Sequence, residues 1–68
     1  MSDLIWHLDA TGIWWLQLHE QVLAEIWLEH SYWNGAVKVG SMKGTVESPS
    51  LTVAKKNAEA LVKEFLEK

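Results

Sequence analysis

The sequence predicts an α+β domain in which an antiparallel meander of four to five short strands packs, by one face, against a single C-terminal α-helix. Apolar residues recur with period 2 before Pro49 and at helical spacing after it. In addition, all five tryptophans precede residue 34, in strand-like stretches. We therefore expect a single domain over residues 1–68, with the meander at 4–47 and the helix at 50–67.

The first part of the chain predicts a β-hairpin preceded by another strand. Apolar side chains alternate in three runs: Leu4-Trp6-Leu8, Trp14-Leu16-Leu18 and Val22-Ala24-Ile26-Leu28. Residues 9–12 (Asp-Ala-Thr-Gly) have the composition of a turn, and residues 19–21 that of a tight hairpin connection. Residues 13–28 are thus expected to form one antiparallel hairpin.

Two readings compete for the next segment. The Asn-Gly pair at 34–35 is a strong two-residue hairpin signal and would pair residues 27–33 with 36–42. Alternatively, the chain turns at residues 29–31 and runs as one strand from Tyr32 to Val39. We favour the second reading because it leaves strands of ordinary length.

A turn at residues 40–43 and a short strand at 44–47 then lead to the helix. Ser50 is the expected N-cap. Apolar residues follow at helical spacing: Leu51, Ala54, Ala58, Leu61, Val62 and Phe65. Charged residues fall on the side expected to face solvent: Lys55, Lys56, Glu59, Lys63 and Glu67. The small side chains of Ala54 and Ala58 would let the helix lie close to the sheet.

Strand alternation divides the sheet into a covered and an uncovered face. The covered face is expected to hold Trp6, Leu8, Trp14, Leu16, Leu18, Ala24, Ile26, Trp33 and Val37. The uncovered face is expected to hold His7, Ile13, Trp15, Gln17, His19, Leu23, Glu25, Trp27, Tyr32 and Lys38. The second set mixes large apolar groups with a few charges, as the core and rim of a protein interface do. Trp15 and Trp27 are therefore expected outside the core, and Trp14 and Trp33 within it.

The candidate partner-binding residues come from this uncovered face and its margin: Ile13, Trp15, Glu25, Trp27, Glu29 and Tyr32. Aromatic side chains dominate the energetics of many interfaces, so Trp15, Trp27 and Tyr32 are the expected anchors. Glu25 and Glu29 would supply charge complementarity toward a basic partner surface.

Composition argues against several other classes of function. The chain has no cysteine, no arginine and a net charge of −3. Its three histidines match no metal-binding spacing, and no nucleophile or phosphate-loop motif is present. We expect no enzymatic activity, no cofactor, no metal site and no small-molecule substrate. No apolar run is long enough for a membrane span, and the N-terminus does not resemble a signal peptide, so a cytoplasmic protein is expected.

Residues 13–66 resemble a group of small bacterial and phage-type proteins in which a tryptophan-rich meander precedes a helix of the form S-L-x-x-A-K-x-x-A-E. The matching residues are Ser50-Leu51, Ala54-Lys55 and Ala58-Glu59. Val53 departs from the pattern, which has an acidic residue there. The resemblance implies a product of a prophage or mobile element, a class in which some members bind and block host defence machinery.

The sequence therefore favours a non-catalytic interaction protein that uses its aromatic sheet face to bind another protein or a second copy of itself as a homodimer. The alternative is a small βββα nucleic-acid-binding module. In that case Trp15 and Trp27 would stack on bases, and Lys38 and Lys43 would contact phosphates. The acidic net charge and the absence of arginine argue against this alternative.

Overall fold

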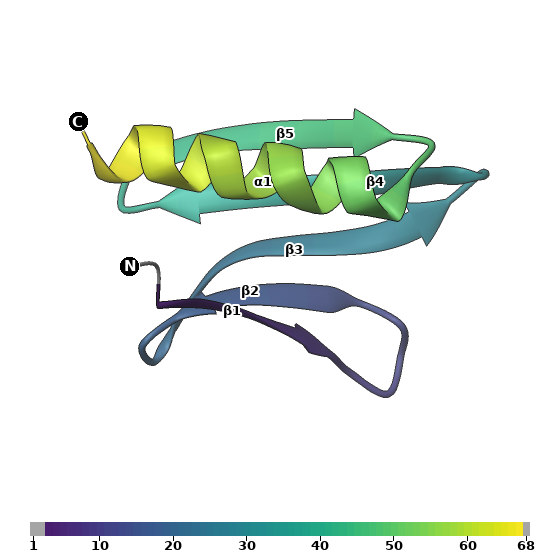
Figure 1. The fold of residues 1–68 in the computed structure, drawn as a ribbon, viewed down its shortest axis with the longest axis horizontal. Coiled ribbons are helices and arrows are strands. Elements are labelled where there is room, and N and C mark those ends of the chain that lie inside the picture. The colour runs from purple at the N-terminus through teal and green to yellow at the C-terminus, as the bar shows by residue number, and fades with distance from the viewer. Residues whose placement is uncertain (1–2, 68) are drawn as a thin grey trace.

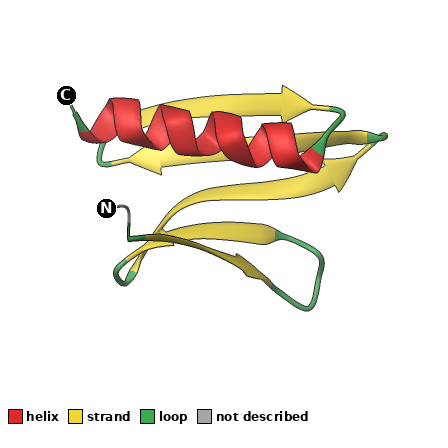
Figure 2. Ribbon diagram, viewed as in Figure 1, coloured by secondary structure: helices red, strands yellow, loops and turns green. Residues whose placement is uncertain are grey.

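A computed structural model describes residues 3–67 and confirms the fold class: one antiparallel sheet with a single helix on one face (Figure 1). The five strands are neighbours in sequence order, with no crossover. Their bounds are β1 Leu4–Leu8, β2 Trp14–Leu18, β3 Gln21–Glu29, β4 Tyr32–Val39 and β5 Met42–Ser48, followed by α1 Leu51–Leu66. Figure 2 shows that short loops connect all of these elements.

Three connections between strands are two-residue turns, at residues 19–20, 30–31 and 40–41. His30 and Ser31 both have positive φ, 52° and 68°, which matches the hairpin turns whose twist suits antiparallel strands. The turn expected at residues 29–31 is thereby confirmed, and the Asn-Gly pair lies inside β4. β5 begins two residues earlier than predicted and ends one later.

The position of Gly35 explains why the Asn-Gly pair does not turn. Gly35 lies between Ile26 and Val46 in neighbouring strands, on the covered face. A Cβ at this position would be 2.6 Å from Val46 Cγ2 and 3.1 Å from Ile26 Cγ1. Glycine is therefore used here because the core has no space for a side chain, and not because the backbone must turn.

The helix packs against β3, β4 and β5. Ser50 caps it by accepting a hydrogen bond from the Val53 backbone N–H at 3.4 Å. Ala54 and Ala58 are fully buried against the sheet, as their size predicts. The core joins these residues to the covered face of the sheet: Leu16, Leu23, Ala24, Ile26, Val37, Ala54, Ala58 and Val62 are buried, and Trp6, Trp14 and Trp33 are among the half-buried residues that pack around them.

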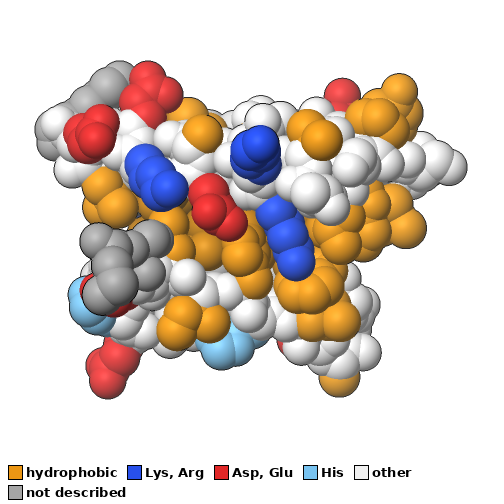
Figure 3. All heavy atoms as spheres, viewed as in Figure 1, with side chains coloured by type: hydrophobic (Ala, Val, Ile, Leu, Met, Phe, Trp, Pro, Cys, Tyr) orange, Lys and Arg blue, Asp and Glu red, His pale blue; other side chains and the backbone are white. Residues whose placement is uncertain are grey.

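Two predicted solvent-facing charges of the helix point instead toward the first two strands. Lys55 Nζ lies 3.3 Å from the ring centroid of Trp14 and 5.5 Å from that of Trp6. Glu59 Oε2 accepts a hydrogen bond of 2.6 Å from Trp6 Nε1. The helix does not extend over β1 and β2, so its long side chains cover these indoles where its backbone cannot. Figure 3 shows this margin, with hydrophobic side chains alongside the helix.

Strict alternation fails at two places. Leu8, expected on the covered face, is 55% exposed, because the helix does not reach the end of β1. In β3 a bulge shifts the register opposite Leu16 and Gln17. Because of it, Val22 does not share the side of Ala24: Val22 is 52% exposed, while Leu23 is buried.

Replacing Gly35 with alanine tests the packing of Gly35 between Ile26 and Val46. We expect Gly35→Ala to destabilise the protein by about 1–3 kcal/mol, because the added methyl meets packed side chains and the nearby Glu25 carbonyl. Urea or thermal unfolding followed by circular dichroism measures the change.

Gly44→Ala is the matched control. Its Cβ would be 2.6 Å from Leu61 Cδ2, the free end of a flexible side chain that can move aside. We expect a smaller loss of stability there. Equal stability of Gly35→Ala and the wild type would contradict the proposed packing.

Candidate interaction surface

Within residues 3–67, no helix, strand or loop covers the sheet face opposite the helix. Strand register assigns it rows of residues that lie side by side across the sheet. We call this surface the uncovered face, and its central part consists of Trp15, Val22, Glu25, Trp27, Glu29, Tyr32, Asn34, Ala36, Lys38, Lys43, Thr45 and Glu47. Alternation along β3, β4 and β5 sends these side chains away from α1.

The structure brings five of the six candidate residues onto the three central strands. Trp15 pairs with Glu25 across β2 and β3, and Glu29 pairs with Tyr32 across β3 and β4. Trp27 lies between these two pairs along β3. Trp15, Glu25 and Trp27 are half-buried, whereas Glu29 and Tyr32 are exposed.

Ile13 lies just before β2 and is half-buried. Alternation from the covered residue Trp14 places Ile13 on the same side as Trp15. Its backbone N–H donates to Asp9 Oδ1 at 3.1 Å, so this position also helps to close the β1–β2 loop.

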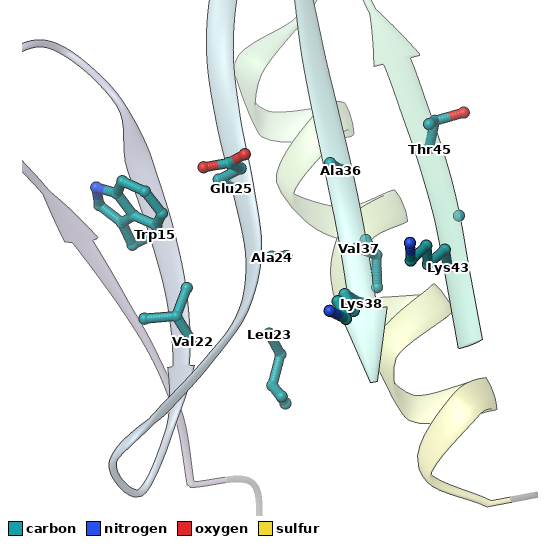
Figure 4. Close-up of a pocket in the computed structure, with 11 residues that line it drawn as sticks. Trp15, Val22, Leu23, Ala24, Glu25, Ala36, Val37, Lys38, Lys43 and Thr45 are labelled. Atoms are coloured by element: carbon teal, nitrogen blue, oxygen red, sulfur yellow. The ribbon is translucent and has the colours of Figure 1, made fainter. Parts of the chain in front are cut away.

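A hollow of about 540 Å³ occupies the middle of the uncovered face (Figure 4). Trp15 and Val22 stand on one side of it, and Lys38 and Lys43 on the other. Ala36 on β4 lies between Glu25 on β3 and Thr45 on β5. The hollow exists because this central side chain is only a methyl group, while the side chains around it are long or aromatic.

Leu23 also lines the hollow, although it is only 6% exposed. The bulge places Val22 and Leu23 opposite the single residue Gln17, so both lie near this part of the face. The sequence predicts Leu23 as an outward-facing residue of the uncovered face, and that prediction is wrong because the bulge buries its side chain. The residue therefore contributes packing and little surface.

Asp9, which the sequence marked only as a turn residue, holds the Trp15 ring in place. Its Oδ2 accepts a hydrogen bond of 2.7 Å from Trp15 Nε1. Its Oδ1 accepts from the Thr11 hydroxyl at 2.6 Å, the Thr11 backbone N–H at 2.8 Å and the Ile13 backbone N–H. The hydrogen bonds from the Thr11 hydroxyl, the Trp15 indole and the two backbone groups hold the pKa of Asp9 well below its usual range.

This arrangement fixes the orientation of one proposed anchor before any partner binds. A side chain that is already immobilised loses less conformational entropy on association. Trp27 differs, because within residues 3–67 its indole N–H makes no hydrogen bond. That donor therefore remains available to a partner.

Charges on the uncovered face separate along the strands. Lys38 and Lys43 pair directly across β4 and β5 at one end. Glu47 and Glu29 lie toward the other end, in the rows of Trp27 and Tyr32. Like charges placed opposite each other on neighbouring strands are unfavourable in isolation, so an acidic group between Lys38 and Lys43 would relieve their repulsion.

The remaining polar residues form no recognisable chemical centre in the part of the chain that the structure describes. His7, His19 and His30 are exposed. Within residues 3–67, no three histidine or carboxylate side chains gather in a way that would hold a metal ion. The described helix is neither long nor apolar enough to span a membrane.

Comparison with protein-family models, with curated proteins and with solved structures gives no match for this chain.

Replacing Asp9 with asparagine tests how Trp15 is held. The amide keeps one acceptor oxygen but turns an NH₂ group toward N–H donors, so we expect Asp9→Asn to lower the melting temperature at neutral pH. Because the pKa of Asp9 is lower in the folded protein, its stabilising effect is complete above the ordinary carboxyl pKa of about 4. That effect is lost as the pH falls toward the lower folded value.

The difference in melting temperature between wild type and Asp9→Asn should therefore shrink as the pH is lowered from neutral to about 2. Circular dichroism melts of both proteins across this range measure it. Glu20→Gln, in the exposed β2–β3 turn, is the control and should change stability little. A difference that stays constant with pH would contradict the assigned role of Asp9.

Proposed function

We propose that this protein is a non-catalytic interaction module that binds another protein molecule through its uncovered face. The observation that carries the proposal is a sheet face that no other element of residues 3–67 covers. On it Trp15 borders a hollow, Trp27 and Tyr32 lie farther along β3 and β4, and acidic and basic residues surround these aromatics. Buried aromatic anchors with a polar rim are the usual composition of protein interfaces.

The geometry supports this proposal in two further ways. Trp15 is held by Asp9, so it is pre-organised, and the Trp27 indole N–H has no hydrogen-bond partner among residues 3–67. The hollow offers a place for a protruding side chain, which is how interface anchors reach full burial. The resemblance to phage-type proteins makes host defence machinery one class of partner consistent with the proposal.

Nucleic-acid binding is a second candidate because Trp15, Lys38 and Lys43 line the same hollow. A base stacked on the Trp15 indole could place its phosphate near the two ammonium groups. Glu25 lines the hollow as well, however, and would repel a phosphate. A quench of tryptophan fluorescence by single-stranded DNA or RNA at low salt, lost in Lys38→Ala, would favour this candidate.

Trp27→Ala tests the proposed interaction. We expect this variant to stay folded, because Trp27 lies on the uncovered face, and to lose at least about tenfold of the binding seen with wild type. Immobilised wild type and variant are each incubated with a bacterial lysate and, separately, with purified wild-type protein. The retained protein is then quantified.

Val53→Ala is the matched control, since Val53 is an apolar residue of the helix that is 45% exposed. It should retain the same proteins as wild type. The proposal fails if wild type retains neither its own copies nor any other protein in a Trp27-dependent manner.

A further inference from the structure

We propose that the occupant of the uncovered face is a second copy of this chain, stacked face to face about a two-fold axis that reverses the strand direction. This inference deepens the proposed function and rests on it. It follows from the positions of the Trp27 side chain, the hollow and the charged residues relative to one row of residues. This row, Glu25–Ala36–Thr45, crosses β3, β4 and β5.

The row on one side of Glu25–Ala36–Thr45 contains Trp27, Asn34 and Glu47, which pair across the same three strands. The row on its other side contains Lys38 on β4 and Lys43 on β5, which pair with each other. On β3, Leu23 lies at this level, since it precedes Ala24, the partner of Val37. Each row lies two residues, or about 7 Å, from the central one. The two flanking rows are therefore equidistant from an axis placed over the central row.

Such an axis runs across the strands, in the plane between the two sheets. It places each strand of one copy over the same strand of the other, with its direction reversed. Trp27 of one copy then lies over Leu23 of the other, at the edge of the hollow that Val22, Leu23 and Lys38 line. The large side chain on one side of the axis thus meets the empty space on the other.

The same operation pairs opposite charges. Lys43 of one copy faces Glu47 of the other on β5, and Lys38 faces Asn34 on β4. Since the dimer is symmetric, each of these contacts occurs twice. Ala36 lies on the axis, where its small side chain lets the two sheets approach to the usual spacing of about 10 Å.

One residue opposes this association. Glu25 belongs to the central row, so the two Glu25 carboxylates approach each other near the axis. This repulsion distinguishes a second copy from a basic foreign partner. A basic foreign partner would be attracted by Glu25, whereas a second copy is repelled by it.

The available area sets the expected affinity. Five strands about 4.8 Å apart and about 20 Å long present roughly 500 Å² on each copy. The total of roughly 1,000 Å² lies at the lower end of specific interfaces. We therefore expect a reversible dimer with a Kd in the micromolar range.

Charge reversal at the Lys43–Glu47 contact tests the inference. Sedimentation equilibrium over micromolar to millimolar concentrations should show a dimer for the wild type. Lys43→Glu and Glu47→Lys should each weaken the dimer by about tenfold or more, because attraction becomes repulsion at two symmetric contacts. The double variant Lys43→Glu/Glu47→Lys restores opposite charges and should regain most of the wild-type affinity.

Glu25→Gln should strengthen the dimer, and Lys56→Glu, on the exposed side of the helix, should leave it unchanged. A wild type that stays monomeric at millimolar concentration overturns the inference, as does a double variant no tighter than the weaker single one. A dimer weakened by Glu25→Gln overturns the proposed register.

The outcomes separate this inference from the proposed function. A monomeric wild type that still retains a foreign protein through Trp27 overturns the second-copy inference and leaves the interaction module standing. A monomeric wild type that retains nothing through Trp27 overturns both.

Discussion

The arrangement of this protein depends on the mismatch between one helix and a five-stranded sheet. A helix is about 10 Å wide, whereas five strands span roughly 20 Å, and a sheet has two faces. The helix therefore covers β3, β4 and β5 on one side only. Every unusual feature of the surface follows from the apolar area that remains: the indoles beside the helix and the aromatic residues of the uncovered face.

Side chains cover the apolar area beside the helix but not that of the uncovered face to the same extent. Beside the helix, Lys55 and Glu59 extend over Trp14 and Trp6, satisfying one indole N–H and covering both rings with charged side chains. On the opposite face Trp27 is half-buried, and within residues 3–67 no cation–π contact or hydrogen bond of this kind is made to its ring. Long side chains that covered the aromatics would leave less surface for a partner, so this difference favours the uncovered face as the proposed binding surface.

Small residues shape both faces of the sheet. Gly35 and Gly44 let side chains of the core and the helix approach closely on the covered face, whereas Ala36 leaves a hollow on the other. The bulge in β3 adds Val22 to the edge of that hollow. Together with Trp15, whose orientation Asp9 fixes, these residues define the shape of the uncovered face before any partner binds.

The sequence alone determined the fold class, the helix with its Ser50 cap, and the sides on which Trp14, Trp15, Trp27 and Trp33 lie, because period-2 and helical spacing are local properties of the chain. It also favoured the correct turn over the stronger Asn-Gly signal. The folded structure was needed to show that Lys55 and Glu59 turn toward β1 and β2, that Leu8 is exposed and Leu23 buried, and that Asp9 holds Trp15. These depend on where the helix ends over the sheet, on a one-residue register shift and on contacts between distant segments, none of which leaves a periodic signal in the chain.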